Sequence, residues 1–194
     1  MTPEPPEPPE PGDRQERILD AVLGLLSRHG IAGVSMRSVA REAGVALGLV
    51  SYYYTDKTGL IRAALLRIEE QDIKLVQGDP ARHPEDRLRG VLGRVVEPQF
   101  LTTGYLSLRL QLWSLAQAHG DFAEINTAAQ RRYRSGLADL IQDARPDLSR
   151  RECSRRAADI DVIQNGMWLT ALLGLDKASL DRAVARCEAI ALER

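Results

Sequence analysis

Long apolar runs and cysteines are both scarce in this 194-residue chain. No apolar run approaches the roughly 18 residues of a membrane-spanning helix, so we expect no membrane partner. The only cysteines, Cys153 and Cys187, are too far apart in the sequence for a metal motif or a disulfide framework. The N-terminus also lacks the basic and then apolar pattern of a secretory signal. These absences together predict a cytoplasmic protein.

The chain also lacks an excess of basic residues. Its net charge is −1 at pH 7, which is not the charge of a protein that coats nucleic acid without specificity. Residues 13–62 carry seven basic and five acidic side chains, a net charge of about +2. Any affinity for DNA must therefore come from a few placed contacts and from dimerisation.

Residues arranged for catalysis are missing as well. His29, His83 and His119 are each expected at a helix end or in a loop, and none has a partner at metal-binding spacing. Neither cysteine has a histidine near it in the sequence, and there is no glycine-rich phosphate loop. We therefore expect no enzymatic activity, no metal and no cofactor.

Amphipathic helical pattern is what the chain has in quantity. Hydrophobic residues make up 44% of the sequence, which is ample for a packed core, and no segment alternates as a strand would. We predict an all-α fold of about nine helices in two domains. The expected helices cover about 13–29, 36–43, 47–53, 56–75, 84–96, 104–119, 121–144, 149–173 and 177–192.

Residues 1–12 differ in composition from the rest. They hold six of the ten prolines and three glutamates, so they cannot bury a core. We interpret them as a disordered acidic arm in extended polyproline conformation. A proline-rich docking ligand is the alternative, although the basic residue that many such ligands carry is absent.

The most informative stretch, residues 35–54, has the pattern of a helix-turn-helix. Ser35 is a good helix N-cap, and Gly44 can end the helix in the left-handed conformation. A second short helix follows from about Leu47 to Tyr53, with Val50 and Tyr54 facing inward. The second helix of such a motif can enter the DNA major groove.

The same region resembles the DNA-binding domain of the TetR family of transcriptional repressors. Two departures are Ala46, where the family usually has Ser or Thr, and Ser51, where it usually has a phosphate-gripping Tyr. Ser51 and the segment Asp56 to Leu60 are closer to the choline-responsive BetI-like branch. The matching positions are Ile18-Leu19-Asp20-Ala21, Gly30, Ser35 to Ala40, Ala43-Gly44-Val45, Gly48, Tyr53-Tyr54, Lys57 and Leu60, with fainter similarity at Leu112 to Ala116 and Asn165 to Leu169.

The resemblance implies a homodimeric repressor that a small-molecule effector releases from a near-palindromic operator. It divides the chain into the arm at 1–12, a DNA-binding domain at 13–60 and an effector-binding and dimerisation domain at 61–194. Two other classes stay open. One is a helical small-molecule-binding protein that keeps the helix-turn-helix as a scaffold, and the other is an interaction module that docks through its aromatic helix.

Candidate DNA contacts surround the second helix of the motif. Gly48 would let the backbone approach the DNA, Leu47 could touch a thymine methyl group, and Ser51 and Tyr52 could bond a base edge or a phosphate. Alternatively, Gly48 and Ser51 are small only to ease helix packing. Helix starts near Ser35 and Lys57 favour bound phosphate. The full set is Ser35, Arg37, Ala46, Leu47, Gly48, Ser51, Tyr52, Tyr53 and Lys57.

An effector pocket is expected in the second domain, where both tryptophans lie although aromatic residues are only 5% of the chain. Aromatic faces could hold a quaternary ammonium such as choline by cation–π attraction, so the effector could be cationic or apolar. Trp113 and Trp168 could equally fill the core. The candidate pocket residues are Tyr105, Gln111, Trp113, Phe122, Asn165 and Trp168.

Two further expectations concern helix faces. Ranges 149–173 and 177–192 would form a four-helix dimer interface with their copies, as in the family, or else an intrachain core. The apolar candidates for that interface are Val162, Leu169, Leu172, Leu173, Leu180 and Val184. In the helix at 56–75, the pattern predicts an outer face of Arg62, Arg67, Glu69 and Glu70.

Overall fold

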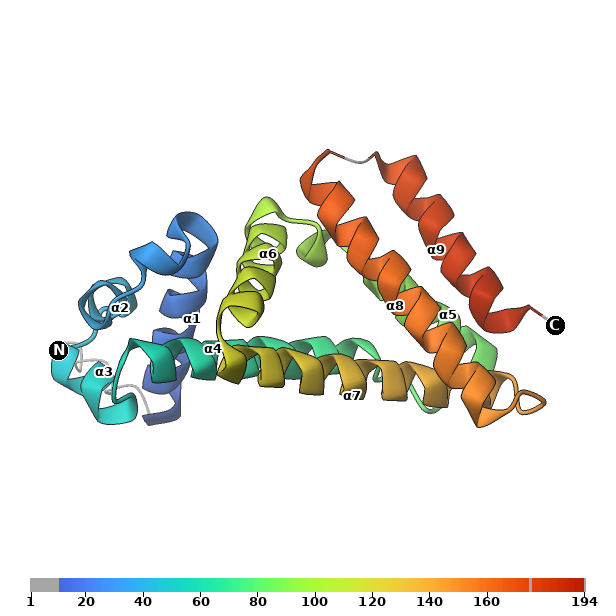
Figure 1. Ribbon diagram of the computed structural model, residues 1–194, viewed down its shortest axis with the longest axis horizontal. Helices are drawn as coiled ribbons and strands as arrows, with labels where there is room; N and C mark the ends of the chain where they lie inside the picture. The colour runs from blue at the N-terminus through green and yellow to red at the C-terminus, as the bar shows by residue number, and fades with distance from the viewer. Residues whose placement is uncertain (1–10, 175, 194) are drawn as a thin grey trace, which may run out of the picture. The chain divides into compact units, whose positions relative to one another are not determined.

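The computed structural model describes residues 11–174 and 176–193. Over those ranges the chain forms nine α-helices, two short 3-10 helices and no strand, which confirms the predicted all-α class (Figure 1). The helices are Pro11–His29 (α1), Met36–Ala43 (α2), Leu47–Tyr53 (α3), Lys57–Leu75 (α4), Pro84–Arg94 (α5), Thr103–Ala118 (α6), Gly120–Ala144 (α7), Arg150–Leu172 (α8) and Lys177–Leu192 (α9).

Differences from the predicted ranges are confined to helix ends and loops. The predicted arm falls mostly on residues 1–10, which lie outside the described residues, whereas Pro11 and Gly12 belong to the first turn of α1. The two 3-10 helices, Ile31–Gly33 (η1) and Pro98–Phe100 (η2), were not predicted because three residues carry no periodic signal.

The chain divides into two compact units inside α4, between Leu65 and Leu66. The division falls five residues beyond the predicted boundary, because Ile61, Ala64 and Leu65 of α4 are buried with the first core. That core is formed by fully or almost fully buried residues of α1 to α4, which include Ile18, Val22, Leu26, Val39, Val50, Leu60, Ile61, Ala64 and Leu65.

Local capping fixes the helix-turn-helix in the first unit. The Ser35 hydroxyl accepts from the Ser38 amide at 3.0 Å, and the Ser38 hydroxyl accepts from the Ser35 amide at 2.8 Å, which completes a capping box. Gly44 ends α2 with φ 64° and ψ 39°, a left-handed conformation that glycine adopts without strain. Ser35 and Gly44 therefore set where α2 starts and stops, as predicted.

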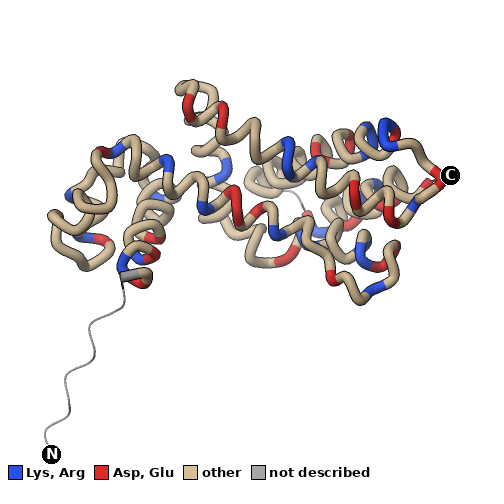
Figure 2. Tube along the Cα trace, turned by 90° about the horizontal axis from the view of Figure 1, so that it is seen from below, with Lys and Arg blue, Asp and Glu red and all other residues tan. Residues whose placement is uncertain are grey.

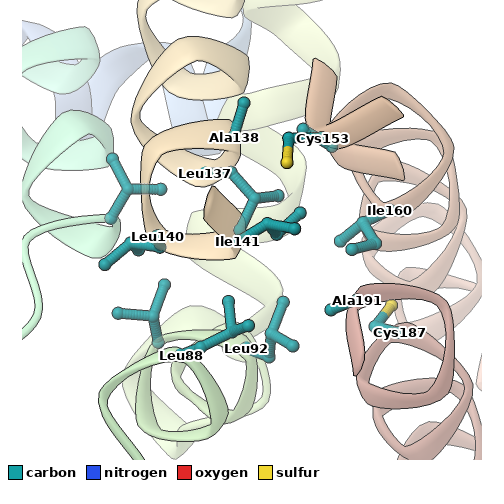
Figure 3. Close-up of a cluster of buried hydrophobic side chains, with 13 residues drawn as sticks. Leu88, Leu92, Leu137, Ala138, Leu140, Ile141, Cys153, Ile160, Cys187 and Ala191 are labelled. Carbon is teal, nitrogen blue, oxygen red and sulfur yellow. The ribbon is translucent and has the colours of Figure 1, made fainter. Parts of the chain in front are cut away.

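In the second unit, α5, α7, α8 and α9 enclose a core of aliphatic side chains (Figure 3). Leu88 and Leu92 come from α5, Leu137 and Ile141 from α7, and Ile160 from α8. Helices α8 and α9 run side by side in opposite directions (Figure 1), and α6 packs against α7 and α8. The two cysteines are free thiols buried in this core.

The surface of the second unit carries charges of both signs. Acidic and basic residues are interspersed along its helices (Figure 2). Two buried arginines bind the end of α9, because Arg145 Nη1 donates to the Leu192 carbonyl at 2.7 Å and Arg156 Nη1 to the Ile190 carbonyl at 3.0 Å. Within the described ranges, no helix is long and apolar enough to cross a membrane.

Candidate nucleic-acid interface and effector pocket

The outer face of α3 consists of small, apolar and aromatic side chains. Val50 and Tyr54 are buried, which leaves Leu47, Gly48, Ser51 and Tyr52 exposed, and Tyr52 is 80% exposed. Ala46 occupies the N-cap of α3 and makes no side-chain cap bond, while its carbonyl accepts from the Leu49 amide at 3.0 Å. The exposed phenol of Tyr52, near the C-terminal end of α3, can bond to a group outside the chain.

Packing does not explain Gly48. A Cβ atom built on it would have no atom within 4 Å, so a larger residue would fit inside this chain. The φ angle of Gly48 is not positive either, and the backbone would therefore accept another residue. Gly48 is exposed, so the room beside it opens to solvent.

Charged residues flank α3 at the starts of α2 and α4. Arg37 is exposed and has no hydrogen bond or ion pair within the described part of the chain. Lys57 differs, because its Nζ donates to the Ile31 carbonyl at 2.7 Å and so fastens the start of α4 to η1. An ammonium group has two further donors for a phosphate. Arg37 and Lys57 therefore both keep donors that could bind a DNA phosphate. Tyr53, in contrast, is half-buried, and the Ser35 hydroxyl is engaged in the cap of α2.

The second unit contains a small inner pocket with about 30 Å³ of free space. That volume holds about two water molecules. Four helices build the wall, and α4 supplies two of its three carboxylates. The lining residues are Glu69, Asp72, Ile73 and Leu75 from α4, Arg109 from α6, Asn126, Ala129, Gln130 and Tyr133 from α7, and Asp161, Gln164, Asn165 and Trp168 from α8.

The aromatic face of this pocket is already occupied by a cation of the chain itself. The Arg109 guanidinium lies 4.5 Å from the Trp168 ring centroid and 5.6 Å from that of Trp113. It also pairs with Asp72, whose other oxygen accepts from the Tyr105 hydroxyl at 2.9 Å. Arg109 therefore takes the cation–π position that the sequence suggested for an effector.

Three polar groups at the pocket lack a hydrogen-bond partner among the described residues. Glu69 is 7% exposed and makes no hydrogen bond or ion pair to any described residue. Gln164 Nε2 and Arg109 Nε are buried donors with no acceptor in the described residues. Burial raises the pKa of Glu69, and the positive charges of Arg109 and Arg132 oppose that effect only in part.

An outer groove adjoins the inner pocket and is much larger, with a volume of about 450 Å³. Three amide side chains, Asn126, Gln130 and Asn165, line both spaces and so form the boundary between them. Trp113 and Thr127 lie in the groove wall. A small molecule could enter through the groove and reach the inner pocket past the three amides.

The predicted pocket residues fall into three groups. Asn165 and Trp168 line the inner pocket, and Trp113 lines the groove. Tyr105 supports the wall through Asp72 and through its ring, which is 6.0 Å from that of Trp168. Gln111 and Phe122 line neither space, and Phe122 is buried against His119. Trp168 also has a structural role, because its Nε1 donates to the Val95 carbonyl at 2.9 Å.

Sequence reasoning missed the charged residues of the pocket. The expected outward position of Glu69 is wrong, because Glu69 is buried. The signal was present, since Leu65, Glu69, Asp72 and Val76 follow the spacing of an inward stripe. Acidic residues on an inward stripe indicate a polar pocket, as do Arg109 and Asp161 on otherwise apolar helix faces.

The predicted dimer residues are likewise divided. Val162, Leu169 and Leu173 are exposed on α8 or at its end, with Val162 66% and Leu173 77% exposed. Leu172 and Val184 are half-buried against the core of their own unit. Leu180 is 5% exposed and packs inside its own chain, so we remove it from the candidate interface.

Two families match successive parts of the chain. Residues 18–64 match the bacterial regulatory proteins of the tetR family, and residues 84–193 match the C-terminal domain of BetI-type transcriptional repressors. Over 171 residues the chain is 25% identical to the HTH-type transcriptional regulator BetI of Escherichia coli O139:H28 (strain E24377A / ETEC), an overlap that covers 84% of this chain and 86% of BetI.

Solved structures share the fold. A transcriptional regulator from Pseudomonas aeruginosa PAO1 matches with a TM-score of 0.81 at 22% identity, over 94% of this chain and 90% of the other. GusR of Salmonella enterica matches with a TM-score of 0.75 at 16% identity, over 97% and 100%. Together with the family matches over both units, these findings show that the chain belongs to the tetR family of DNA-binding transcriptional regulators and carries a C-terminal domain of the BetI type.

Proposed function

We propose that this regulator represses transcription in the cytoplasm as a homodimer on a near-palindromic operator, from which a small molecule in the second unit releases it. The exposed face of α3 is the observation that carries the proposal. Leu47, Gly48, Ser51 and Tyr52 are exposed on a helix of a capped helix-turn-helix, and this exposure is suited to reading the major groove.

An exposed apolar stripe supports the homodimer. Val162, Leu169 and Leu173 are separated by seven and four residues, the spacing of one face of a helix, and Gly166 between them is exposed too. Burying such a stripe against its copy removes apolar surface from water. A dimer would present two recognition helices to two half-sites of the operator.

Helix α4 gives effector and DNA a shared element. Its first turn holds Lys57, which is bonded to Ile31 in the first unit, and its fourth and fifth turns hold Glu69 and Asp72 in the inner pocket. An effector that binds one position of α4 better than another shifts the population of DNA-binding dimers. By linkage, operator DNA must then weaken effector binding by the same factor.

Gel shift of the purified protein on the DNA upstream of its own coding sequence tests this function. We expect a retarded band whose formation weakens steeply with salt, because phosphate contacts release counterions. A band that persists unchanged across a broad salt range would favour docking by apolar contact. Complete absence of DNA binding would instead favour a protein that keeps the helix-turn-helix only as a scaffold.

A further inference from the structure

The three carboxylates of the inner pocket differ in the hydrogen bonds and ion pairs that they form within the chain. Asp72 accepts from Tyr105 and Arg109, one donor to each oxygen. Asp161 accepts from Arg134 Nε at 2.6 Å on one oxygen and from Asn165 Nδ2 at 3.1 Å on the other. Among the three carboxylates, Glu69 is the one that accepts no hydrogen bond and forms no ion pair within the described residues, although the charges of Arg109 and Arg132 act on it from a distance.

A buried carboxylate without a hydrogen-bond partner is unfavourable, and the charges of Arg109 and Arg132 offset the burial of Glu69 only in part. Gln164 Nε2 and Arg109 Nε, both unpaired, lie in the same wall. The site thus offers one anionic acceptor and two donors to a molecule that would bring a cationic donor and an oxygen. These groups come from α4, α8 and α6, so they converge from three helices.

Volume restricts the shape of that molecule. About 30 Å³ accommodates an ammonium head of roughly the size of a water molecule, but not three methyl groups on nitrogen. The adjoining groove of about 450 Å³ has room for the remainder of a ligand. The amides of Asn126, Gln130 and Asn165 at the boundary can bond polar atoms of that remainder.

We propose that the effector of this regulator is a small amine with N–H donors, whose ammonium head binds Glu69 in the inner pocket and whose oxygen-bearing remainder extends past the three amides into the groove. A quaternary ammonium does not meet these requirements, because it has no N–H for Glu69 and is too large for the inner pocket. Its usual cation–π position over Trp168 is also taken by Arg109. The proposal rests on the proposed function, of which it specifies the effector.

A methylation series of one molecule isolates the head group. We would titrate the full chain by calorimetry with 2-aminoethanol, its N-methyl and N,N-dimethyl derivatives, and choline. The three protonated amines and choline all carry one positive charge and one hydroxyl group. The number of N–H donors on nitrogen falls from three in 2-aminoethanol to none in choline. We expect affinity to fall along the series, with choline on the order of tenfold or more weaker than 2-aminoethanol, the loss that a charged hydrogen bond predicts.

Two variants separate Glu69 from general electrostatics. Glu69→Gln removes the charge at nearly constant shape and should weaken 2-aminoethanol binding on the order of tenfold or more. Glu70→Gln removes the same charge from the exposed neighbouring position on α4 and should leave the affinity unchanged. Both proteins are checked for helical content by circular dichroism, so a folding defect cannot pass for loss of the site.

Several outcomes would overturn the proposal. Choline binding as tightly as 2-aminoethanol would contradict the need for an N–H donor, and equal affinities of Glu69→Gln and the unchanged protein would remove Glu69 as the anchor. If no amine gave a heat of binding in the titration, the inner pocket would not be an amine site and the proposal would be wrong. Gel shift on upstream DNA distinguishes these failures from failure of the proposed function, because a protein that binds DNA but no amine stays a repressor with another effector.

Discussion

At the scale of single residues, the two functional regions are built on opposite principles. The outer face of α3, which we propose reads DNA, exposes most of the Tyr52 side chain and the open side of Gly48. The pocket instead buries polar groups whose hydrogen-bonding capacity is left incomplete, above all Glu69. In both regions, groups that can still form contacts or hydrogen bonds indicate where a ligand would bind.

We expect Glu69 to make the stability of the protein depend on pH. Its pKa is raised by burial, so the folded state favours the protonated acid, and stability is lost as the pH rises through the raised value. We expect Glu69→Gln to gain stability over the unchanged protein as the pH increases from about 4 toward 8, measured by urea unfolding. A stability difference that is the same at every pH would contradict a buried, ionising Glu69, and Glu70→Gln is the exposed control.

Arg37 and Lys57 should both contact phosphates but differ in their effect on folding. Replacing either by alanine should lower the slope of log affinity against log salt by about 0.9, the change expected for one lost phosphate contact. Lys57→Ala should also cost about 1 kcal/mol of stability, because it removes the bond to Ile31. Arg37→Ala should leave stability within about 0.5 kcal/mol.

The matched control for these variants is Arg151→Ala, which removes an exposed charge from the second unit. It should change neither the salt slope nor the stability. Salt slopes measured by fluorescence anisotropy on one DNA fragment decide the assignment. A slope that Arg37→Ala leaves unaltered would take Arg37 off the DNA-contacting surface.

At the scale of helices, local signals determined most of what could be predicted. Ser35, Gly44 and the apolar spacing between them defined α2, because caps and periodicity are properties of neighbouring residues. The wall of the pocket could not be obtained in this way, since it depends on which faces of α4, α6, α7 and α8 meet. Arg109 over Trp168 is such a contact, and no pattern within either helix predicts it.

The two glycines of the helix-turn-helix should respond in opposite directions to alanine. Gly44→Ala should destabilise the protein by about 1–2 kcal/mol, because φ is +64° and the added Cβ would lie 3.1 Å from Arg17 Nη2. Gly48→Ala should stabilise it by about 0.4–1 kcal/mol, since the position is helical and open.

At Gly48, we expect one substitution to change stability and DNA affinity in opposite directions. Gly48→Ala should weaken operator binding although it stabilises the fold, because the methyl group occupies the space left for DNA. Thermal unfolding and anisotropy on the same preparation measure both quantities. A variant that is more stable and binds DNA with undiminished affinity would show that the DNA does not approach Gly48.

At the scale of the whole molecule, the account requires a second copy of the chain. Leu173→Glu places a charge on the exposed apolar stripe of α8 and should convert the dimer to monomers in sedimentation velocity experiments. DNA affinity should fall with it, because one half-site then binds alone. Leu110→Glu alters an exposed leucine of α6 and is the matched control, which should remain dimeric. Two variants with the same oligomeric state would exclude the α8 stripe as the interface.

Coupling between pocket and DNA is the central claim, and one titration tests it directly. Labelled DNA from upstream of the coding sequence is saturated with the protein, and 2-aminoethanol is added while anisotropy is followed for the unchanged chain and for Glu69→Gln. The account predicts that the amine releases DNA from the unchanged chain, and that Glu69→Gln requires on the order of ten times more amine for the same release. DNA that stays bound at saturating amine, or is released equally from both proteins, would contradict it.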